Sequence, residues 1–412
     1  MKRFIMAFIA ILTFGIVKYD PKNTNYSNVH YTFGGFNLQL FANTNMDYLY
    51  PEFWAAAFDA INAGKYQLQN LVSRKYESLV GTFGDTVNVP ISPSFTAEDW
   101  TPGSAITPTN VTQEKVAVTL DKSKKVTFNI TGKEQTLSKY DLIMDWGRPA
   151  AEAILENLNQ VVYAEMIKSP YVTNALAGVT DSLIIDAGTA LSNRKISSNR
   201  ALVSRPDDIG TLMKLPAFAA VYASGKDDIV NDGMITRRYG FNFYENNAIS
   251  KYTPADLTGA VNNVGGYAIG ATTMVVDGFA DNATPLRAGD TFTVVGSTVR
   301  YTVQSTALTL GATTTINFLP SLDAAVLDDA VITVSASASM VAFTPDSFAL
   351  AARPYALLPD KSGVMGTVIN YQGIPIRISV FHDGSLGLSV QYDILYGVSI
   401  IDNKRIQRVI TA

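Results

Sequence analysis

"DLIMDWGRPAAEAILENLNQVVYAEMIKSP", residues 141–170, is the stretch that decides the fold. Its apolar side chains recur every three or four residues, the spacing of a helix that packs one face against a sheet. Pro149 suits a first helical turn, and Ser169 with Pro170 ends the run. The predicted helix covers 149–168 and is about 30 Å long at the standard rise per residue, enough to span a whole domain. Its predicted apolar face comprises Leu142, Trp146, Ala150, Ala153, Ile154, Leu158, Val161 and Val162.

Two different patterns precede this helix. Residues 51–79 are rich in helix formers with apolar residues at helical spacing, which predicts one amphipathic helix interrupted near Gly64. Residues 82–131 instead alternate β-branched with polar residues and contain four prolines. Proline is poorly tolerated in central strands, so this stretch predicts a long extended hairpin with exposed edges.

Strand and helix signals follow one another after residue 170. "RALVSR", residues 200–205, predicts a short strand, and "PDDIGTLMKL", residues 206–215, predicts a brief helix capped by Asp207 or Asp208. "MITRRYGFNFYENN", residues 234–247, predicts a strand and a turn. The fold class predicted from this succession is α+β.

The pattern of apolar and polar residues changes again at about residue 252. Up to residue 341, short runs of alternating apolar and polar residues are separated by Gly, Asp and Pro turns, which predicts a small antiparallel barrel or sandwich inserted into the chain. The glycine-rich stretch "NNVGGYAIGATT", residues 262–273, is predicted to be a flexible linker into this insert. Longer strands, Ile374–Phe381 and Leu386–Ile401, then complete the sheet that the insert interrupts.

Composition excludes several functional classes. The 412 residues are 47% apolar and 17% charged with a net charge of −4, which provides a large core and disfavours binding to nucleic acid through phosphate neutralisation. There is no cysteine, and the only histidines are His30 and His382, so thiolate chemistry and histidine metal clusters are excluded. Residues 4–17 form an apolar run behind Lys2 and Arg3, which is either an incomplete export signal or an apolar arm.

A search for catalytic motifs gives a negative prediction. His382, Asp383 and Ser385 stand close together in "FHDGSLG", but strand geometry separates adjacent side chains and turn chemistry explains Asp383 better. Glu114 and Asp121 lie in the predicted hairpin, where carboxylates are usually solvated. We therefore predict no catalytic residue, no cofactor and no metal ligand.

Three stretches carry a resemblance to a known family. "NLQLFAN" (37–43) is similar to the start of many phage capsid proteins, and "FNITGKEQTLSKYDLIMDWGRPAAEAILENLNQVV" (128–162) is similar to their segment joining an extended loop to a spine helix. "LRAGDTFTVVG" (286–296), followed by "FTPDSFALAARPY" (343–355), is similar to an inserted domain and its exit. In this order, they resemble the major capsid protein of tailed bacteriophages with the Hong Kong 97 type of fold, and most closely short-tailed-phage coat proteins with an inserted β domain.

The resemblance implies a division of the chain. Coat proteins of this family begin close to a stretch such as "NLQLFA", so residues 1–36 are an extra arm, a segment removed on maturation, or the product of a mis-set translation start. The implied parts are an N-terminal arm (1–50), a helical segment (51–81), the extended loop (82–131), the spine helix and peripheral domain (132–198), the first part of the apical domain (199–251), the inserted β barrel (252–341) and the returning apical and peripheral strands (342–412).

The implied function is structural. Copies of the chain would form hexamers and pentamers of an icosahedral shell in the virion, assembled in the host cytoplasm with portal and scaffolding proteins, enclosing double-stranded DNA without sequence-specific binding and without a membrane. An exported surface-layer or adhesin-like protein is the alternative, favoured by the apolar N-terminus and the β-rich insert.

Two groups of residues are candidate contacts between copies. The first is aromatic, and its members are either interface anchors or local core contacts. The second is basic. Its members are either solvated charges, among them a charged strand edge that blocks unwanted strand pairing, or groups that meet carboxylates of a neighbouring copy. The candidates are Phe53, Trp54 and Trp100, and Lys122, Lys124, Lys125, Arg237 and Arg238.

Overall fold

A computed structural model of the chain forms two compact units, residues 1–48 and 49–412. In the first unit, β1 (Thr32–Phe33) and β2 (Phe36–Asn37) pair antiparallel. The predicted arm, the apolar run 4–17 and the break at Gly64 otherwise lie outside the described residues. The structure describes residues 32–33, 36–37, 51–59, 61, 68–77, 85–91, 93, 95, 97, 99, 101–104, 111–131, 143–174, 179–196, 198–219, 235, 237–247, 249, 258–279, 286–307, 313–335, 338–357, 364–382 and 387–411.

The long helix α5 (Arg148–Met166) is present where the sequence predicts it. A short π-helix, η4 (Ile143–Gly147), precedes it, and the backbone N–H of Ile167 closes its last turn on Tyr163 O. Its buried face is wider than predicted, because α5 packs on two strands and on two further helices, α2 and α3. Ala153, predicted on that face, is exposed. The buried set is Ala150, Ala151, Ile154, Leu155, Leu158, Asn159, Val162, Tyr163 and Met166.

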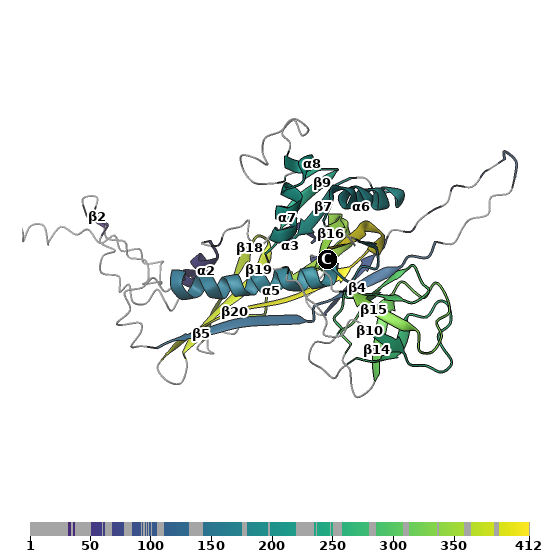
Figure 1. Cartoon of the computed structure of the whole chain (residues 1–412). Helices are drawn as coiled ribbons and strands as arrows, with labels where there is room; N and C mark the ends of the chain where they lie inside the picture. Colours follow the sequence, from purple (N-terminus) through teal and green to yellow (C-terminus); the bar gives the residue numbers. More distant parts are fainter. Residues whose placement is uncertain are drawn as a thin grey trace, which may run out of the picture. The chain divides into compact units, whose positions relative to one another are not determined.

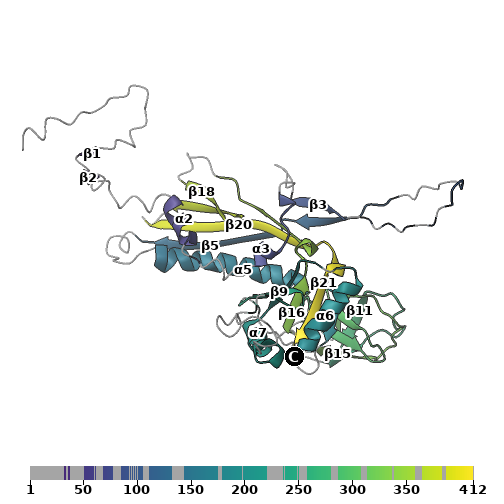
Figure 2. The ribbon, with the colours of Figure 1, turned by 90° about the horizontal axis from the view of Figure 1, so that it is seen from above.

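The sheet beneath α5 is built around β20 (Leu388–Ile400). One edge of β20 pairs antiparallel with β5 (Lys122–Ile130), from Leu388 opposite Ile130 to Tyr396 opposite Lys122. Further partners are β17 (Phe348–Arg353) and β19 (Ile374–His382), and β19 pairs in turn with β18 (Val364–Tyr371). The helix runs along this sheet in Figures 1 and 2. The two predicted return strands are thus confirmed.

The predicted hairpin 82–131 is only partly correct. Strands β3 (Thr86–Pro90) and β4 (Lys115–Thr119) do pair antiparallel, as a two-stranded ribbon. The chain then leaves the ribbon at Leu120 and enters β5, which belongs to the larger sheet. The reason is apolar contact, because Phe128 of β5 packs its ring against Trp54 with the centroids 5.3 Å apart.

The N-terminal helical segment, predicted as one helix interrupted near Gly64 and reaching residue 79, ends earlier than predicted. It contains α2 (Pro51–Asp59) and the one-turn helix α3 (Leu68–Leu71). Helix ends at Leu71 because Ser73 forms a parallel bridge with Ala349 and its N–H donates to Phe348 O at 3.2 Å. Ser73 therefore lies at the edge of β17, and residues 74–77 form a turn closed by the N–H of Glu77 on Arg74 O instead of continuing the helix.

A second sheet has six strands with helices packed on its apolar face. Its core includes Leu202, Phe241 and Met340, together with Leu183 and Leu212 from the helices. The sheet order is β6 (Val172–Asn174), β21 (Ile406–Thr411), β16 (Ala338–Phe343), β7 (Arg200–Ser204), β9 (Phe241–Glu245) and β8 (Arg237–Arg238). The helices are α6 (Asp181–Asn193), α7 (Pro206–Met213) and α8 (Pro216–Ala219), and two single 3₁₀ turns, η5 (Pro345–Ser347) and η7 (Asn403–Arg405), flank the returning strands.

Within this sheet, β7 and α7 are confirmed, whereas the predicted cap is wrong. The residue at the N-cap of α7 is Arg205, and no side chain caps the helix. Asp208 instead pairs with Arg205, whose Nη2 lies 2.8 Å from Asp208 Oδ1. The ion pair competes for the carboxylate that would otherwise accept a backbone N–H.

Six strands between residues 258 and 335 close into a barrel. Inside it, the rings of Phe292, Tyr301 and Phe318 contact one another with centroids 5.3–5.4 Å apart. The barrel order is β10 (Thr258–Val261), β11 (Thr273–Asp277), β14 (Thr313–Leu319), β13 (Arg300–Val303), β12 (Thr291–Val294) and β15 (Val331–Ser335).

The glycine-rich stretch 262–273 is not the linker that the sequence predicted. It connects β10 to β11 inside the barrel, and Gly266 has φ +63°. A Cβ on Gly266 would lie 2.5 Å from Val326 O, so the glycine lets two backbone segments approach closely.

Gly397 allows β20 to cross the end of β4. A Cβ at this position would lie 2.0 Å from Thr119 O and 2.7 Å from the Thr119 carbonyl carbon. Both are backbone atoms, so no rotamer change relieves the clash. We expect Gly397→Ala to lower the free energy of unfolding by at least about 2 kcal/mol in urea titrations, the effect of overpacking a rigid site.

Gly210→Ala is the matched control. Gly210 lies inside α7, no atom would come within 4 Å of its Cβ, and alanine favours helix. This variant should be as stable as the parent or more stable by about 0.5–1 kcal/mol. Equal losses in both variants would contradict the proposed crossing constraint.

Candidate functional site

The three aromatic candidates have different outcomes. Trp54 is fully buried: its ring contacts Phe128 edge to face, and its carbonyl accepts a hydrogen bond from the Tyr392 hydroxyl at 3.2 Å. Of the two alternatives for Trp54, these contacts fit the local core contact. Phe53 lies in α2, but its side chain is outside the described residues, as is Trp100.

The three lysine candidates lie together on β5. Lys124 and Lys125 are exposed, and Lys122 is partly exposed with its Nζ 2.5 Å from Asp121 Oδ2. One edge of β5 pairs with β20, and in the described part of the chain no strand pairs with its other edge. The location fits a charged strand edge and equally leaves these ammonium groups open to a partner.

The two arginine candidates lie elsewhere. Arg237 and Arg238 form β8, the last strand of the six-stranded sheet. Arg237 is exposed, whereas Arg238 places its guanidinium carbon 5.9 Å from the centre of the Phe218 ring. The structure therefore does not gather the eight candidates into one site.

Sequence reasoning missed the exposed apolar residues of the excursion between β3 and β4. Phe95 is 72% exposed and Val111 53% exposed. Asp99 and Glu114 in the same excursion are also exposed. The available signal was the pair of aromatic residues, Phe95 and Trp100, within the otherwise small and polar stretch "SPSFTAEDW", residues 92–100, of which only Trp100 is among the sequence candidates.

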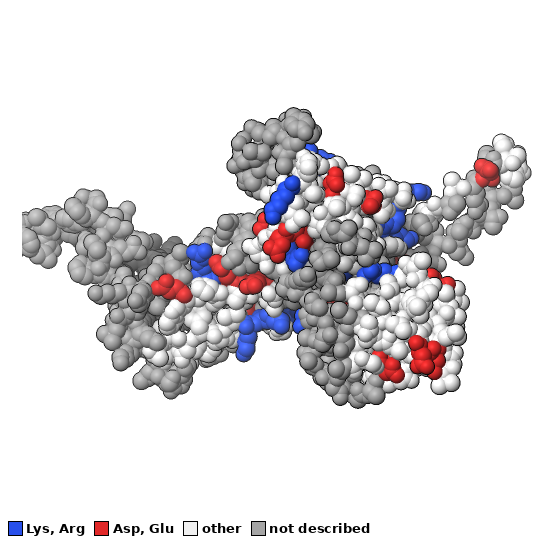
Figure 3. All heavy atoms as spheres, in the orientation of Figure 1, with Lys and Arg blue, Asp and Glu red and all other residues white. Residues whose placement is uncertain are grey.

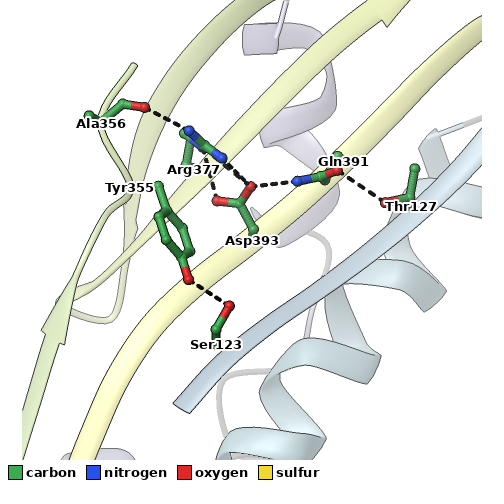
Figure 4. A network of polar contacts seen from close by, with 7 residues as sticks. All are labelled: Ser123, Thr127, Tyr355, Ala356, Arg377, Gln391 and Asp393. Carbon is green, nitrogen blue, oxygen red and sulfur yellow. Dashed lines mark hydrogen bonds and ion pairs between the residues drawn. The ribbon is translucent and has the colours of Figure 1, made fainter. Parts of the chain in front are cut away.

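A buried ion pair joins β19 to β20, on the side of β20 opposite β5. Arg377 of β19 donates from Nε to Asp393 Oδ1 at 3.0 Å and from Nη2 to Oδ2 at 2.7 Å, and Asp393 is 2% exposed (Figure 4). Gln391 donates to the same carboxylate at 2.7 Å and accepts from Thr127 of β5 at 3.3 Å. Tyr355, which lies against Arg377, donates to Ser123 Oγ at 2.5 Å. The network couples β5 to β19 across β20.

The barrel meets the six-stranded sheet at Arg408. This residue of β21 is fully buried, and its Nη2 donates to Gly289 O of the barrel at 2.7 Å. Nη1 lies 3.4 Å from both Ser169 O and Thr302 Oγ1. Burial lowers the pKa of Arg408 to about 10, which leaves the guanidinium charged at neutral pH.

Asp290 is the buried carboxylate beside this joint. It is 5% exposed, and its Oδ2 accepts the backbone N–H of Arg287 at 2.7 Å. Burial raises the pKa of Asp290 to about 6, against the opposing effects of that hydrogen bond and of the positive charges on Arg408 and Arg287. Ionisation of Asp290 in the folded chain is thus costly even next to cations.

No group of three or more His, Cys, Asp and Glu side chains among the described residues is arranged to hold a metal ion. His382 lies at the end of β19, while Asp383 and Ser385 fall outside the described residues. None of the described helices combines the length and apolar character of a membrane span. On the face drawn in Figure 3, described acidic and basic side chains are interspersed, with no large basic patch.

No family model matches the chain, and no curated protein matches it. Among solved structures, it is similar to one from Mycobacterium phage Che8, with TM-score 0.49, 13% identity and coverage of 85% of this chain and 92% of the other. The capsid of cyanophage P-SCSP1u gives TM-score 0.49, 10% identity and coverage of 86% and 90%. The mature capsid of bacteriophage PhiM1 gives TM-score 0.45, 11% identity and coverage of 79% of this chain and 82% of the other.

The ion pair of Arg377 and Asp393 yields a test of the sheet. In Arg377→Met, the buried carboxylate loses its cation, so we expect the free energy of unfolding to fall by about 3–5 kcal/mol. Arg148→Met is the control, since Arg148 and Glu152 form a pair with side chains 41% and 20% exposed. It should cost less than about 1 kcal/mol. Urea unfolding of both variants measures the difference, and similar losses would show that burial of the pair does not matter.

Asp290 yields a test by pH. Its pKa is higher in the folded chain than its ordinary value of 3.8, so folding is favoured while Asp290 is protonated and this contribution is lost as the pH rises from about 4 to about 6. Asp290→Asn removes the titration but keeps an oxygen to accept from Arg287. Its stability relative to the parent should therefore rise by up to about 3 kcal/mol between pH 4 and pH 7. Parallel pH profiles of parent and variant, measured by urea unfolding, would contradict the assignment.

Proposed function

We propose that this chain is a structural shell protein, the major capsid protein of a tailed double-stranded DNA bacteriophage, which self-assembles into an icosahedral shell. The observation that carries the proposal is the excursion between Pro90 and Lys115. Its described residues are exposed or half-exposed, including Phe95 and Val111, so these residues bury little apolar surface on their own chain. Folding an extended segment of this length costs conformational entropy that contacts with another molecule must offset.

A second copy of the same chain is the partner that charge favours. The excursion carries exposed carboxylates at Asp99 and Glu114, and the outer edge of β5 carries exposed ammonium groups at Lys124 and Lys125. An excursion from one copy laid on the β5 edge of another would pair opposite charges and set the register between them. Repeated around a ring, such a head-to-tail contact closes into hexamers and pentamers.

The remaining parts take roles by resemblance to the Hong Kong 97 type of fold. Residues 82–131 would act as the extended loop and α5 as the spine helix over the five-stranded peripheral sheet. The six-stranded sheet would be the apical domain, and the barrel a domain inserted into it. Portal and scaffolding proteins would be partners, the packaged DNA would be enclosed without sequence readout, and assembly would take place in the host cytoplasm.

The test of this function is direct observation of assembly. Purified full-length protein should form closed particles on the order of tens of nanometres across in negative-stain electron microscopy and elute as a large species in size-exclusion chromatography. A flat lattice would favour the exported surface-layer alternative instead. A monomer under every condition tried, at high and low salt, would overturn the proposal.

Charge reversal on β5 tests the proposed contact. In Lys124→Glu with Lys125→Glu, carboxylates would face carboxylates of the neighbouring excursion, so the association constant should fall at least about tenfold. Lys214→Glu, a charge reversal at an exposed lysine just after α7 and away from β5, is the control for position and should assemble normally. Circular dichroism checks that each variant folds. Equal assembly of all three proteins would remove β5 from the interface.

A further inference from the structure

A cavity of about 550 Å³ lies between the barrel and the sheet that carries β6 and β21. The body contributes Tyr171, Thr173, Arg194 and Gln407 to its lining, and the barrel contributes Thr298 and Arg300. Two guanidinium groups from different parts of the fold thus line one cavity. None of the described residues that line it is a carboxylate.

Arg194 is held in place but keeps unused donors. Its Nε donates to Ala190 O at 3.1 Å, Nη1 donates to Ile406 O at 3.1 Å, and Nη2 donates to the side-chain oxygen of Gln407. Its guanidinium lies 4.2 Å from the centre of the Tyr171 ring. A guanidinium has five N–H groups, so two of them remain after these bonds. Because the group is fixed by backbone carbonyls and an aromatic ring, it is oriented in advance for a ligand.

Arg300 is fixed from the barrel side. Its Nη1 donates to Ser335 Oγ at 2.8 Å and to Thr291 Oγ1 at 3.2 Å, and no bond from Nε or Nη2 to a described residue is present. All of its fixed partners are neutral hydroxyls. The charge of Arg300 is therefore not compensated by a described carboxylate in contact with it.

Burial makes this charge imbalance costly. The pKa of Arg194 is lowered by burial, although Tyr171 and the more distant Asp402 act in the opposite direction. Asp402 is already engaged, since its Oδ2 accepts from Arg405 Nε at 3.1 Å. Burial alone lowers the pKa of Arg300. An anion that entered the cavity would offset the charge of each of these partly desolvated cations.

We propose that this cavity binds one phosphate dianion, free or as a small phosphate monoester, between Arg194 and Arg300. A dianion matches two guanidinium charges, whereas a single carboxylate would leave one of them uncompensated. Thr173 and Thr298 place hydroxyl groups on the lining that can donate to further phosphate oxygens. The site goes beyond the proposed shell function and does not depend on it, since it lies wholly within one chain.

Bound phosphate would tie the barrel to the body. Its two cationic ligands come from β13 and from the end of α6, and these elements otherwise belong to different hydrophobic cores. The ligand would thus reinforce the joint at Arg408 from the outside. A ligand that binds only the folded arrangement raises its stability by mass action.

Isothermal titration of the dispersed full-length chain with inorganic phosphate at pH 7.5 and constant ionic strength tests the site. We expect one phosphate per chain, and at least about a tenfold weaker affinity in Arg300→Gln, the loss of one charge-assisted contact. Arg148→Gln is the control. Arg148 is the first residue of α5, whereas the cavity lies beyond the last residue of that helix, so this variant loses the same charge elsewhere and should bind phosphate as the parent does. If Arg300→Gln fails to fold, Thr298→Val serves as the second test. It changes only an exposed hydroxyl of the lining and should weaken phosphate binding severalfold.

Further titrants decide the ligand class. Glycerol phosphate with an affinity similar to that of inorganic phosphate supports a site for the free dianion or a monoester. Four results would overturn the proposal. Acetate could bind as tightly as phosphate, or an oligonucleotide could bind where phosphate does not. Arg148→Gln could lose as much phosphate affinity as Arg300→Gln, or no titrant could produce heat. Shell formation is scored separately by microscopy, so either proposal can fail without the other.

Discussion

The hydrogen bonding of β20 is the constraint on which the rest of the structure depends. This strand of 13 residues pairs with β5 along one side and with β19 and β17 along the other, so segments from residues 122–130 and 348–382 are held in one sheet. The same strand carries Tyr392, whose ring contacts Phe58 of α2 and Phe128 of β5. Gly147, just before α5, lies close to Trp54 and Tyr392: a Cβ there would lie 3.3 Å from the Trp54 ring and 3.2 Å from the Tyr392 hydroxyl, so a larger side chain would displace them. One strand thus fixes where the long helix begins and where the chain passes from the β3–β4 ribbon into the larger sheet.

The barrel is attached by a different kind of contact. Its core of Phe292, Tyr301, Phe318 and neighbouring residues is separate from the core of the six-stranded sheet. The described contacts between the barrel and the body include polar ones through Arg408 and through Gln304, which donates to Lys168 O at 2.9 Å. Polar contacts of this kind specify orientation more than they add stability, because the desolvation of a buried cation offsets much of its attraction. The barrel therefore behaves as a module whose position is set by a few directional bonds.

Local periodicity explains which elements were predicted. The helix α5 and the strands β7, β19 and β20 carry local patterns that predict their type, although β7 is buried along its whole length and the buried face of α5 is wider than its pattern. Helix α6 was not predicted because "DSLIIDAGTALSN" contains glycine, threonine and serine, which favour other structures locally, and it forms by packing Leu183, Ile184 and Leu191 on the six-stranded sheet. Long-range pairing also decided the errors: Ser73 pairs with β17 instead of extending a helix, and β5 joins β20 instead of closing a hairpin.

The candidate site could be predicted only in part for a related reason. A sequence pattern shows that an aromatic residue must find a partner, but it does not say whether that partner belongs to the same chain. Trp54 finds Phe128 and Tyr392 within its own fold, whereas Phe95 remains 72% exposed. In a protein that acts by associating with copies of itself, the second kind of residue carries the function, because apolar area left open in the single chain is what association removes from water. Arg194 and Arg300 follow the same logic for charge: 106 positions apart in the sequence, they become a possible ligand site only because the barrel closes and then docks beside α6.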